Sequence, residues 1–229
     1  MLPLKLQKAL ALLAYLVVNG QPYTREALAT LLWPDYDQSG GRGRLRRTLY
    51  ELNNILAGDI LTATSDIIRL DDEADVWIDV QAFRQIVADS LPGGAPDATL
   101  SQKQLQRLEE AAELYSDDFL AGFSLPDAPE FEEWRFFLAE ELRRSLAAVL
   151  VQLSRAYRQQ RAWDQAIQHA RRWLALDALH EPAHRLLMRL YASSDRLAAA
   201  LRQYEQCVQL LRDELGAEPE KETTELYEA

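Results

Sequence analysis

A chain of 229 residues, 48% of them hydrophobic, is long enough for one large or two small domains and too apolar for intrinsic disorder. Its formal net charge of −11 excludes general affinity for nucleic acids or anionic membranes, so any contact with DNA has to be local. The single cysteine, Cys207, forms no internal disulfide bond, which is typical of a protein of the reducing cytoplasm.

The first predicted helix covers residues 4–18. Lys5 and Lys8 precede an apolar run, as in a secretory signal peptide, but no small-residue cleavage site follows that run. The run is also shorter than the roughly 20 residues that span a bilayer. We therefore expect a buried helix that ends at Asn19-Gly20, and no association with a membrane.

Two further helices are predicted next. Thr24 is a suitable N-cap for a helix over residues 25–32, which Trp33-Pro34 ends. A third helix is expected over residues 41–56, after a turn at Gly40-Gly41. Its apolar stripe is formed by Leu45, Leu49, Leu52 and Leu56, which fall on one side of the helix.

Positive charge is concentrated in this third helix. Residues 1–60 contain seven basic and five acidic side chains, a net charge of +2, so residues 61–229 have a net charge of −13. Such an asymmetry suggests a reader of polyanions joined to an acidic body. An arginine-rich helix face that is merely solvated is the alternative.

A short β-hairpin is predicted after the third helix, with residues 60–63 and 67–70 flanking Thr64-Ser65-Asp66. Three helices followed by a hairpin are typical of a winged helix-turn-helix domain. In that arrangement the recognition helix lies in the major groove and the wing touches the neighbouring backbone.

The chemistry of DNA recognition divides the polar residues of this region into two groups. Arginine pairs with guanine and asparagine with adenine in the major groove, whereas other arginines and hydroxyls bind phosphates. The base-contact candidates are Arg46, Arg47, Tyr50 and Asn54. The phosphate-contact candidates are Arg42, Arg44, Thr62, Thr64 and Arg69.

The rest of the chain is predicted to be almost entirely helical from Leu105 onward, with a long helix over residues 131–160. Six positions recur at an offset of 34 residues, namely Leu153/Leu187, Tyr157/Tyr191, Trp163/Leu197, Ala166/Ala200, Ile167/Leu201 and Leu174/Val208. This is the period of tetratricopeptide helix pairs, which stack into curved surfaces that bind proteins or peptides.

The sequence His180-Glu181-Pro182-Ala183-His184 matches the H-E-x-x-H pattern of zinc peptidases. Pro182 excludes a continuous helix across His180 but suits the first turn of a helix that begins near Glu181. We therefore predict no metal site, no cofactor and no enzymatic activity. His169 is expected to be solvated, and the acidic run 71–75 to be an exposed link between two domains.

Several segments together are typical of one protein family. They are residues 8–16 (KALALLAYL), 24–34 (TREALATLLWP), 45–52 (LRRTLYEL), 75–83 (DVWIDVQAF), 181–188 (EPAHRLLM) and 215–219 (LGAEP), with Tyr115, Phe119-Leu120 and Trp134. In these segments the chain resembles the bacterial transcriptional activator domain proteins, which include the Streptomyces antibiotic regulatory proteins. In that family an OmpR-type winged helix precedes a tetratricopeptide-like helical domain.

The resemblance implies a mainly α fold, with a winged helix-turn-helix domain over residues 1–78 and an all-α helical domain over residues 79–229. It implies a DNA-binding transcriptional regulator, an activator, whose partners are double-stranded promoter DNA and a protein or peptide on the repeats. It is also compatible with RNA polymerase as a partner and with a homodimer.

The sequence departs from the family in two places. The small N-terminal β-sheet of the family is expected to be missing, and Asn53-Asn54 replace arginines late in the recognition helix. We expect either that the sequence is a fragment or begins at a wrong start, or that the protein has lost part of its winged helix. In the second case DNA affinity is expected to be weak, and the alternative function is a protein-interaction or signal-input module whose winged helix no longer binds DNA.

Overall fold

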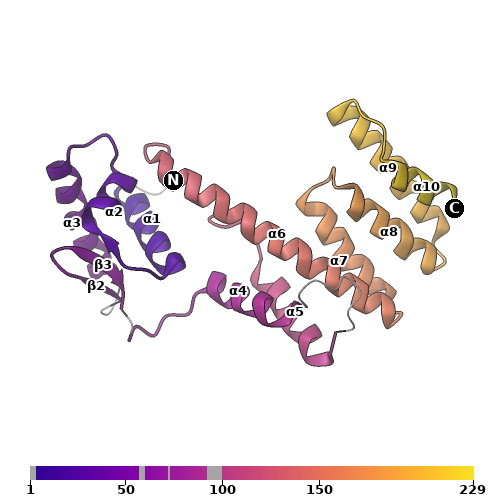
Figure 1. Ribbon diagram of the computed structural model, residues 1–229, viewed down its shortest axis with the longest axis horizontal. Coiled ribbons are helices and arrows are strands. Elements are labelled where there is room, and N and C mark those ends of the chain that lie inside the picture. Colours follow the sequence, from indigo (N-terminus) through magenta and orange to yellow (C-terminus); the bar gives the residue numbers. More distant parts are fainter. Residues whose placement is uncertain (1–3, 57–59, 72, 92–99) are drawn as a thin grey trace. The chain divides into compact units, whose positions relative to one another are not determined.

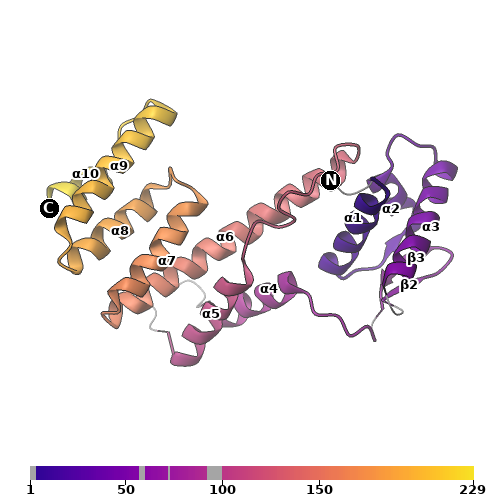
Figure 2. The same ribbon diagram turned by 180° about the vertical axis from the view of Figure 1, so that it is seen from behind.

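The computed structural model describes residues 4–56, 60–71, 73–91 and 100–229 (Figures 1 and 2). The chain forms two compact units. The first unit comprises residues 1–84 and 117–141, and the second comprises residues 85–116 and 142–229. The chain therefore leaves the first unit and returns to it before it completes the second. The fold is mainly α with a small sheet, as predicted from the sequence.

The first unit contains a helix-turn-helix followed by a hairpin. Its elements are α1 (Leu4–Asn19), β1 (Tyr23–Thr24), α2 (Arg25–Leu32), α3 (Gln38–Ile55), β2 (Leu61–Ala63) and β3 (Ile67–Leu70), and it shares α4 (Asp79–Ser90) with the second unit. The predicted second helix is confirmed, with Thr24 Oγ1 accepting a hydrogen bond from Ala27 N at 3.1 Å. The predicted hairpin is also confirmed. The sequence did not predict β1, which pairs antiparallel with β3 and gives the strand order β1-β3-β2.

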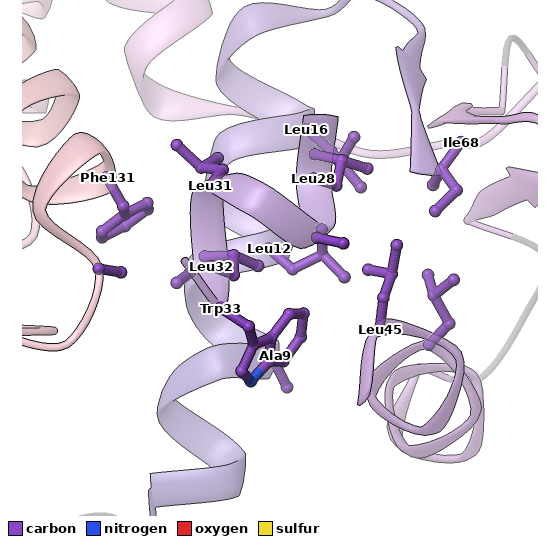
Figure 3. Close-up of a cluster of buried hydrophobic side chains, with 14 of the residues drawn as sticks. Ala9, Leu12, Leu16, Leu28, Leu31, Leu32, Trp33, Leu45, Ile68 and Phe131 are labelled. Atoms are coloured by element: carbon purple, nitrogen blue, oxygen red, sulfur yellow. The ribbon is translucent and has the colours of Figure 1, made fainter. Parts of the chain in front are cut away.

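A single hydrophobic core holds these elements together. Leu12 from α1, Leu28 from α2, Leu45 from α3 and Ile68 from β3 are fully buried within it. Figure 3 shows Phe131 directed at the same core from the segment 117–141, and its side chain is fully buried as well. The winged helix therefore depends for its packing on residues that lie far along the chain.

Polar contacts fix α1 to that distant segment. The buried Lys8 ammonium forms an ion pair with Asp127 at 2.9 Å and a hydrogen bond with the carbonyl oxygen of Leu32. Trp134 Nε1 donates a hydrogen bond to Asn19 Oδ1 at 3.3 Å. A buried cation is tolerated only when it is paired, and here Asp127 and Leu32 supply that pairing.

The second unit is built from helices. They are α5 (Gln102–Leu114), the later part of α6 (Pro129–Gln159), α7 (Trp163–Leu176), α8 (Glu181–Ser193), α9 (Leu197–Leu215) and α10 (Lys221–Glu228). The 34-residue repeat is visible in this arrangement, because Trp163 and Leu197 are the first residues of α7 and α9. Ala166 and Ala200 are both buried, which permits close approach of neighbouring helices. In Figures 1 and 2, α7, α8 and α9 follow one another side by side.

Among the described residues, no helix is both long enough and apolar enough to span a bilayer.

Candidate nucleic-acid interface

The helix α3 begins three residues earlier than the sequence predicted. Asp37 is its N-cap, and Asp37 Oδ1 accepts a hydrogen bond from Gly40 N at 2.9 Å. A Cβ atom on Gly41 would lie 3.3 Å from the Cβ atom of Ala29 in α2. The prediction of a turn at Gly40-Gly41 was therefore wrong. Gly41 lies inside the helix, where it permits close packing of α2 against α3.

One side of α3 is buried in the core. Leu45, Leu49 and Leu52 are 0%, 5% and 2% exposed, and Leu56 packs against the same cluster. The predicted leucine stripe is confirmed. Because this stripe fixes the rotation of the helix about its axis, the opposite face is directed away from the core.

The opposite face presents the predicted polar residues. With about 100° per residue, Arg42 and Arg44 lie at the two edges of this face. Between them the order around the helix is Arg46, Tyr50, Asn54 and Arg47, with Tyr50 and Asn54 on either side of the middle. All six side chains are exposed, and Tyr50 is 69% exposed. The base-contact candidates thus lie between the two helical phosphate-contact candidates.

Two of the arginines form ion pairs on this surface. Arg42 lies 3.6 Å from Glu26, and Arg47 Nε donates a hydrogen bond to Glu51 at 3.2 Å. Such exposed pairs contribute only about 0–1 kcal/mol each. A phosphate oxygen or a guanine base can therefore replace either carboxylate at little cost.

The other two arginines differ in how they are held. The Arg44 guanidinium stacks on the Tyr36 ring, 3.8 Å from its centre, which fixes its direction. Arg46 has no hydrogen-bond or ion-pair partner among the described residues. Arg46 is accordingly the helix arginine with the fewest interactions to lose on binding an anion.

The wing turn between β2 and β3 is organised by Thr64 and by a residue that sequence reasoning missed. Thr64 Oγ1 accepts hydrogen bonds from Ile67 N at 3.1 Å and Asp66 N at 3.3 Å. Arg25 Nε donates to the Thr64 carbonyl oxygen at 2.7 Å, and Arg25 N donates to the Asp66 carbonyl oxygen at 2.9 Å. A basic residue in the first turn of a helix opposes the helix dipole. The unfavourable position of Arg25 at the start of α2 is the feature of the sequence that could have indicated a specific role for this residue.

The base of the wing contains a carboxylate beside two phosphate-contact candidates. Thr62 Oγ1 donates a hydrogen bond to Asp71, which lowers the pKa of that carboxyl group, and the Glu73 N–H and nearby Arg69 lower it further. Thr62 and Arg69 therefore interact with an anion of the chain itself. Among the three wing candidates, Thr64 is exposed at the turn, whereas Thr62 and Arg69 are half-buried.

The sequence profile of the family described as Bacterial transcriptional activator domain matches residues 78–229, about two thirds of the chain. The chain belongs to the bacterial transcriptional activator domain family. This is a family of transcriptional regulators, so membership assigns the chain to a regulatory class and not to an enzyme family.

A solved structure resembles this activator-domain protein along its whole length. Mycobacterium tuberculosis EmbR, in complex with a low-affinity phosphopeptide, superposes with a TM-score of 0.70 and 24% sequence identity. The match covers 99% of this chain and 59% of the EmbR chain, and at that identity it shows a shared fold. A search of curated proteins finds no match.

The zinc-peptidase pattern of this family member lies at the start of α8, where it has structural roles. His180 is the N-cap of α8 and Pro182 lies in its first turn, as predicted. His184 Nε2 lies 2.9 Å from the Ala178 carbonyl oxygen, and its Nδ1 accepts a hydrogen bond from Gln203 at 2.8 Å. Within the described ranges, no group of three or more His, Cys, Asp or Glu side chains is placed to hold a metal ion.

The expectation for His169 was wrong. His169 is 8% exposed, its Nε2 lies 3.0 Å from Glu109 Oε1, and its ring stacks on Tyr157 at 5.6 Å. Hydrogen bonds from His169 and Tyr157 outweigh the opposing effect of burial and lower the pKa of Glu109. These residues connect α5, α6 and α7 within the second unit.

Proposed function

We propose that this chain is a DNA-binding transcriptional regulator that activates promoters in the bacterial cytoplasm. In this proposal residues 1–78 bind DNA and residues 79–229 form the regulatory domain. The observation that supports it best is the face of α3 that a buried leucine stripe directs away from the core, where arginine, tyrosine and asparagine side chains are exposed.

In the proposed complex α3 lies in the major groove, which is wide enough to admit an α-helix. Arg46 and Arg47 bind guanine bases, Asn54 binds adenine, and Tyr50 at the middle of the face contacts base edges. Each well-formed bidentate contact contributes about 1–3 kcal/mol of discrimination against the wrong base. The two edge arginines, Arg42 and Arg44, bind phosphates of the strands on either side of the groove.

We propose that the wing contacts the neighbouring DNA backbone. The exposed Thr64 at the turn is the best placed of its phosphate candidates, and Thr62 and Arg69 complete the set. Arg25 acts indirectly, because its two hydrogen bonds to the turn hold Thr64 in position relative to α2.

Activation requires a protein contact besides DNA. We propose that the stacked helices of the second unit provide it, with RNA polymerase, which is compatible with the family resemblance, as the partner. The resemblance is also compatible with a homodimer on DNA. The alternative, an interaction module without DNA binding, is supported by Asn53-Asn54 and by the glutamates that pair with Arg42 and Arg47.

The proposal is tested by selecting duplexes from a random-sequence pool with the wild-type chain and measuring their affinity for variants. R46A/R47A should weaken binding by about 1–3 kcal/mol per removed base contact and relax the preferred sequence. R202A/R212A, which removes two exposed arginines of the second unit, is the charge-matched control and should bind as the wild type does. Failure to select any duplex, or equal effects of the two double variants, would contradict the proposal in favour of the interaction module.

A further inference from the structure

A second concentration of arginine occurs in the second unit, in a part of the chain whose overall charge is acidic. Residues 143–189 contain three acidic residues, Asp164, Asp177 and Glu181, against nine arginines, a net charge of +6. The arginines are Arg143, Arg144, Arg155, Arg158, Arg161, Arg171, Arg172, Arg185 and Arg189. A local excess of this size in a chain of net charge −11 indicates an anionic partner.

Four of these arginines line one cavity of about 420 Å³. The lining consists of Val151, Arg155, Arg158, Trp173, Pro182, Arg185, Leu186 and Arg189. Acidic side chains are absent from this described lining. The cavity thus combines arginine side chains with an aromatic ring and aliphatic side chains.

The helical repeats bring these residues together. Val151, Arg155 and Arg158 are spaced four and three residues apart, so they share one face of α6. Arg185 and Arg189 are likewise four residues apart on α8. Trp173 projects from α7, the helix between them in sequence. The site is therefore formed by three consecutive helices of a single unit.

The four guanidinium groups differ in their hydrogen-bond and ion-pair partners. Arg185 donates hydrogen bonds to Glu220 at 2.6 Å and to Thr223 Oγ1 at 2.9 Å, so it is held in place by α10. The guanidinium groups of Arg158 and Arg189 have no hydrogen-bond or ion-pair partner within the described parts of the chain. Glu181 also lies 4.0 Å from the Arg185 guanidinium, so the charge of Arg185 is already compensated. A bound anion would supply the partner that the Arg158 and Arg189 guanidinium groups lack.

The apolar part of the cavity is held rigidly as well. The Trp173 ring packs edge-on against His180, with 5.1 Å between the ring centres. Leu186 and Val151 provide aliphatic surface beside it. A flat ring can stack on tryptophan while arginines bind the acid groups attached to it.

We propose that this cavity binds a small polyanion that bears a flat ring, of the class to which nucleotides belong. The ligand's phosphate or carboxylate oxygens accept hydrogen bonds from Arg158 and Arg189, and its ring packs against Trp173. A volume of about 420 Å³ lies within the range of small-molecule sites. This site is separate from the proposed DNA-binding face and gives the regulator a ligand-binding function of its own.

The test uses isothermal titration calorimetry of the full chain with three probes, namely ATP, inorganic pyrophosphate and a hexaglutamate peptide. We expect ATP to bind, pyrophosphate to bind more weakly because it has no ring, and the peptide not to bind. R158A/R189A should weaken ATP binding at least tenfold, and W173L should weaken it several-fold. The control R202A/R212A removes the same charge outside the cavity and should leave ATP binding unchanged.

Circular dichroism and a thermal melt establish that each variant is folded before its binding is compared. Absence of binding by all three probes would overturn the proposal. ATP binding that is unaffected by R158A/R189A would overturn it too, because the ligand would then lie elsewhere. If the peptide binds and ATP does not, and if R158A/R189A abolishes binding of the peptide, the ligand is an acidic protein segment and the proposal of a small ligand is rejected.

Discussion

The two arginine groups of this protein differ in shape and in how the chain assembles them. The arginines of α3 come from six consecutive positions, 42–47, and project from the exposed side of one helix. The cavity arginines come from α6 and α8, and Arg158 and Arg189 are 31 residues apart in the sequence. A projecting surface suits a long groove such as that of DNA, whereas a hollow of about 420 Å³ suits a small ligand. The packing around an arginine side chain therefore determines which kind of anionic partner it suits.

The two units also differ in how their cores are completed. The repeats of the second unit pack neighbouring helices against each other, whereas the first unit needs residues 117–141 in addition to residues 1–84. The proposed DNA-binding face is thus predicted to depend on a segment outside the winged helix itself.

The largest expected effect is on the stability of the first unit. Phe131→Ala removes a fully buried ring that packs with the winged-helix core, and should lower the free energy of unfolding by about 3–5 kcal/mol. Urea denaturation measures this change. Phe136→Ala, at a 56% exposed position of the same helix, is the control and should change it by less than about 0.5 kcal/mol. Equal effects would refute the dependence on the distant segment.

A smaller effect is expected where α10 is attached to α8 beside the cavity. The Glu181 carboxylate accepts hydrogen bonds from Glu220 N at 2.9 Å and from the buried Thr223 hydroxyl at 2.6 Å. Glu181→Ala should cost about 1.5–3 kcal/mol, because hydrogen bonds to a charged group are lost. Amide hydrogen exchange should increase specifically in α10. Unchanged protection of α10 would show that this carboxylate does not hold it.

Acid should weaken the second unit through Glu109. Because the pKa of Glu109 is lowered in the folded state, this carboxylate stabilises the protein above its usual pKa. That contribution is lost as the pH falls through the lowered value. Urea unfolding between pH 7 and pH 3 should show this loss, and Glu109→Gln should reduce it. The exposed Glu113→Gln on the same helix is the control, and an equal reduction there would contradict the assignment.

The smallest effect distinguishes the edge of the α3 face from its middle. R42A/R44A should weaken binding to all duplexes alike and lower the slope of log affinity against log salt by about one per lost phosphate contact. R158A/R189A, which removes the same charge from the cavity, should leave the slope unchanged. If R158A/R189A also lowered the slope of log affinity against log salt, the two arginine groups would not differ in their contact with DNA, and the prediction would be wrong.

Local signals explain what could be predicted from the sequence. The Thr24 cap, the Trp33-Pro34 stop and the leucine period defined α2 and the buried side of α3, because each acts within a few residues. The start of α3 was predicted wrongly because Gly41 permits close packing against Ala29 in another helix. A contact between two helices leaves no pattern in the sequence next to the glycine.

The features that the sequence could not reveal depend on distant partners. His169 was expected in solvent because Glu109 is 60 residues away from it. Phe131 was assigned only to its helix, since nothing near it in sequence indicates a place in the winged-helix core. The cavity was likewise hidden, because Arg158 and Arg189 become neighbours only when the repeats stack.

The central claim, that α3 lies in the major groove, is tested most directly by cross-linking from its middle. Cys207 is fully buried, and burial raises its pKa to about 11, so a photo-reactive thiol reagent should label Tyr50→Cys selectively. We predict cross-links from position 50 to base edges in the major groove of a selected duplex. Gln209→Cys, exposed on α9, should give none. Bound DNA without cross-links from position 50, or with equal cross-links from position 209, would contradict the account.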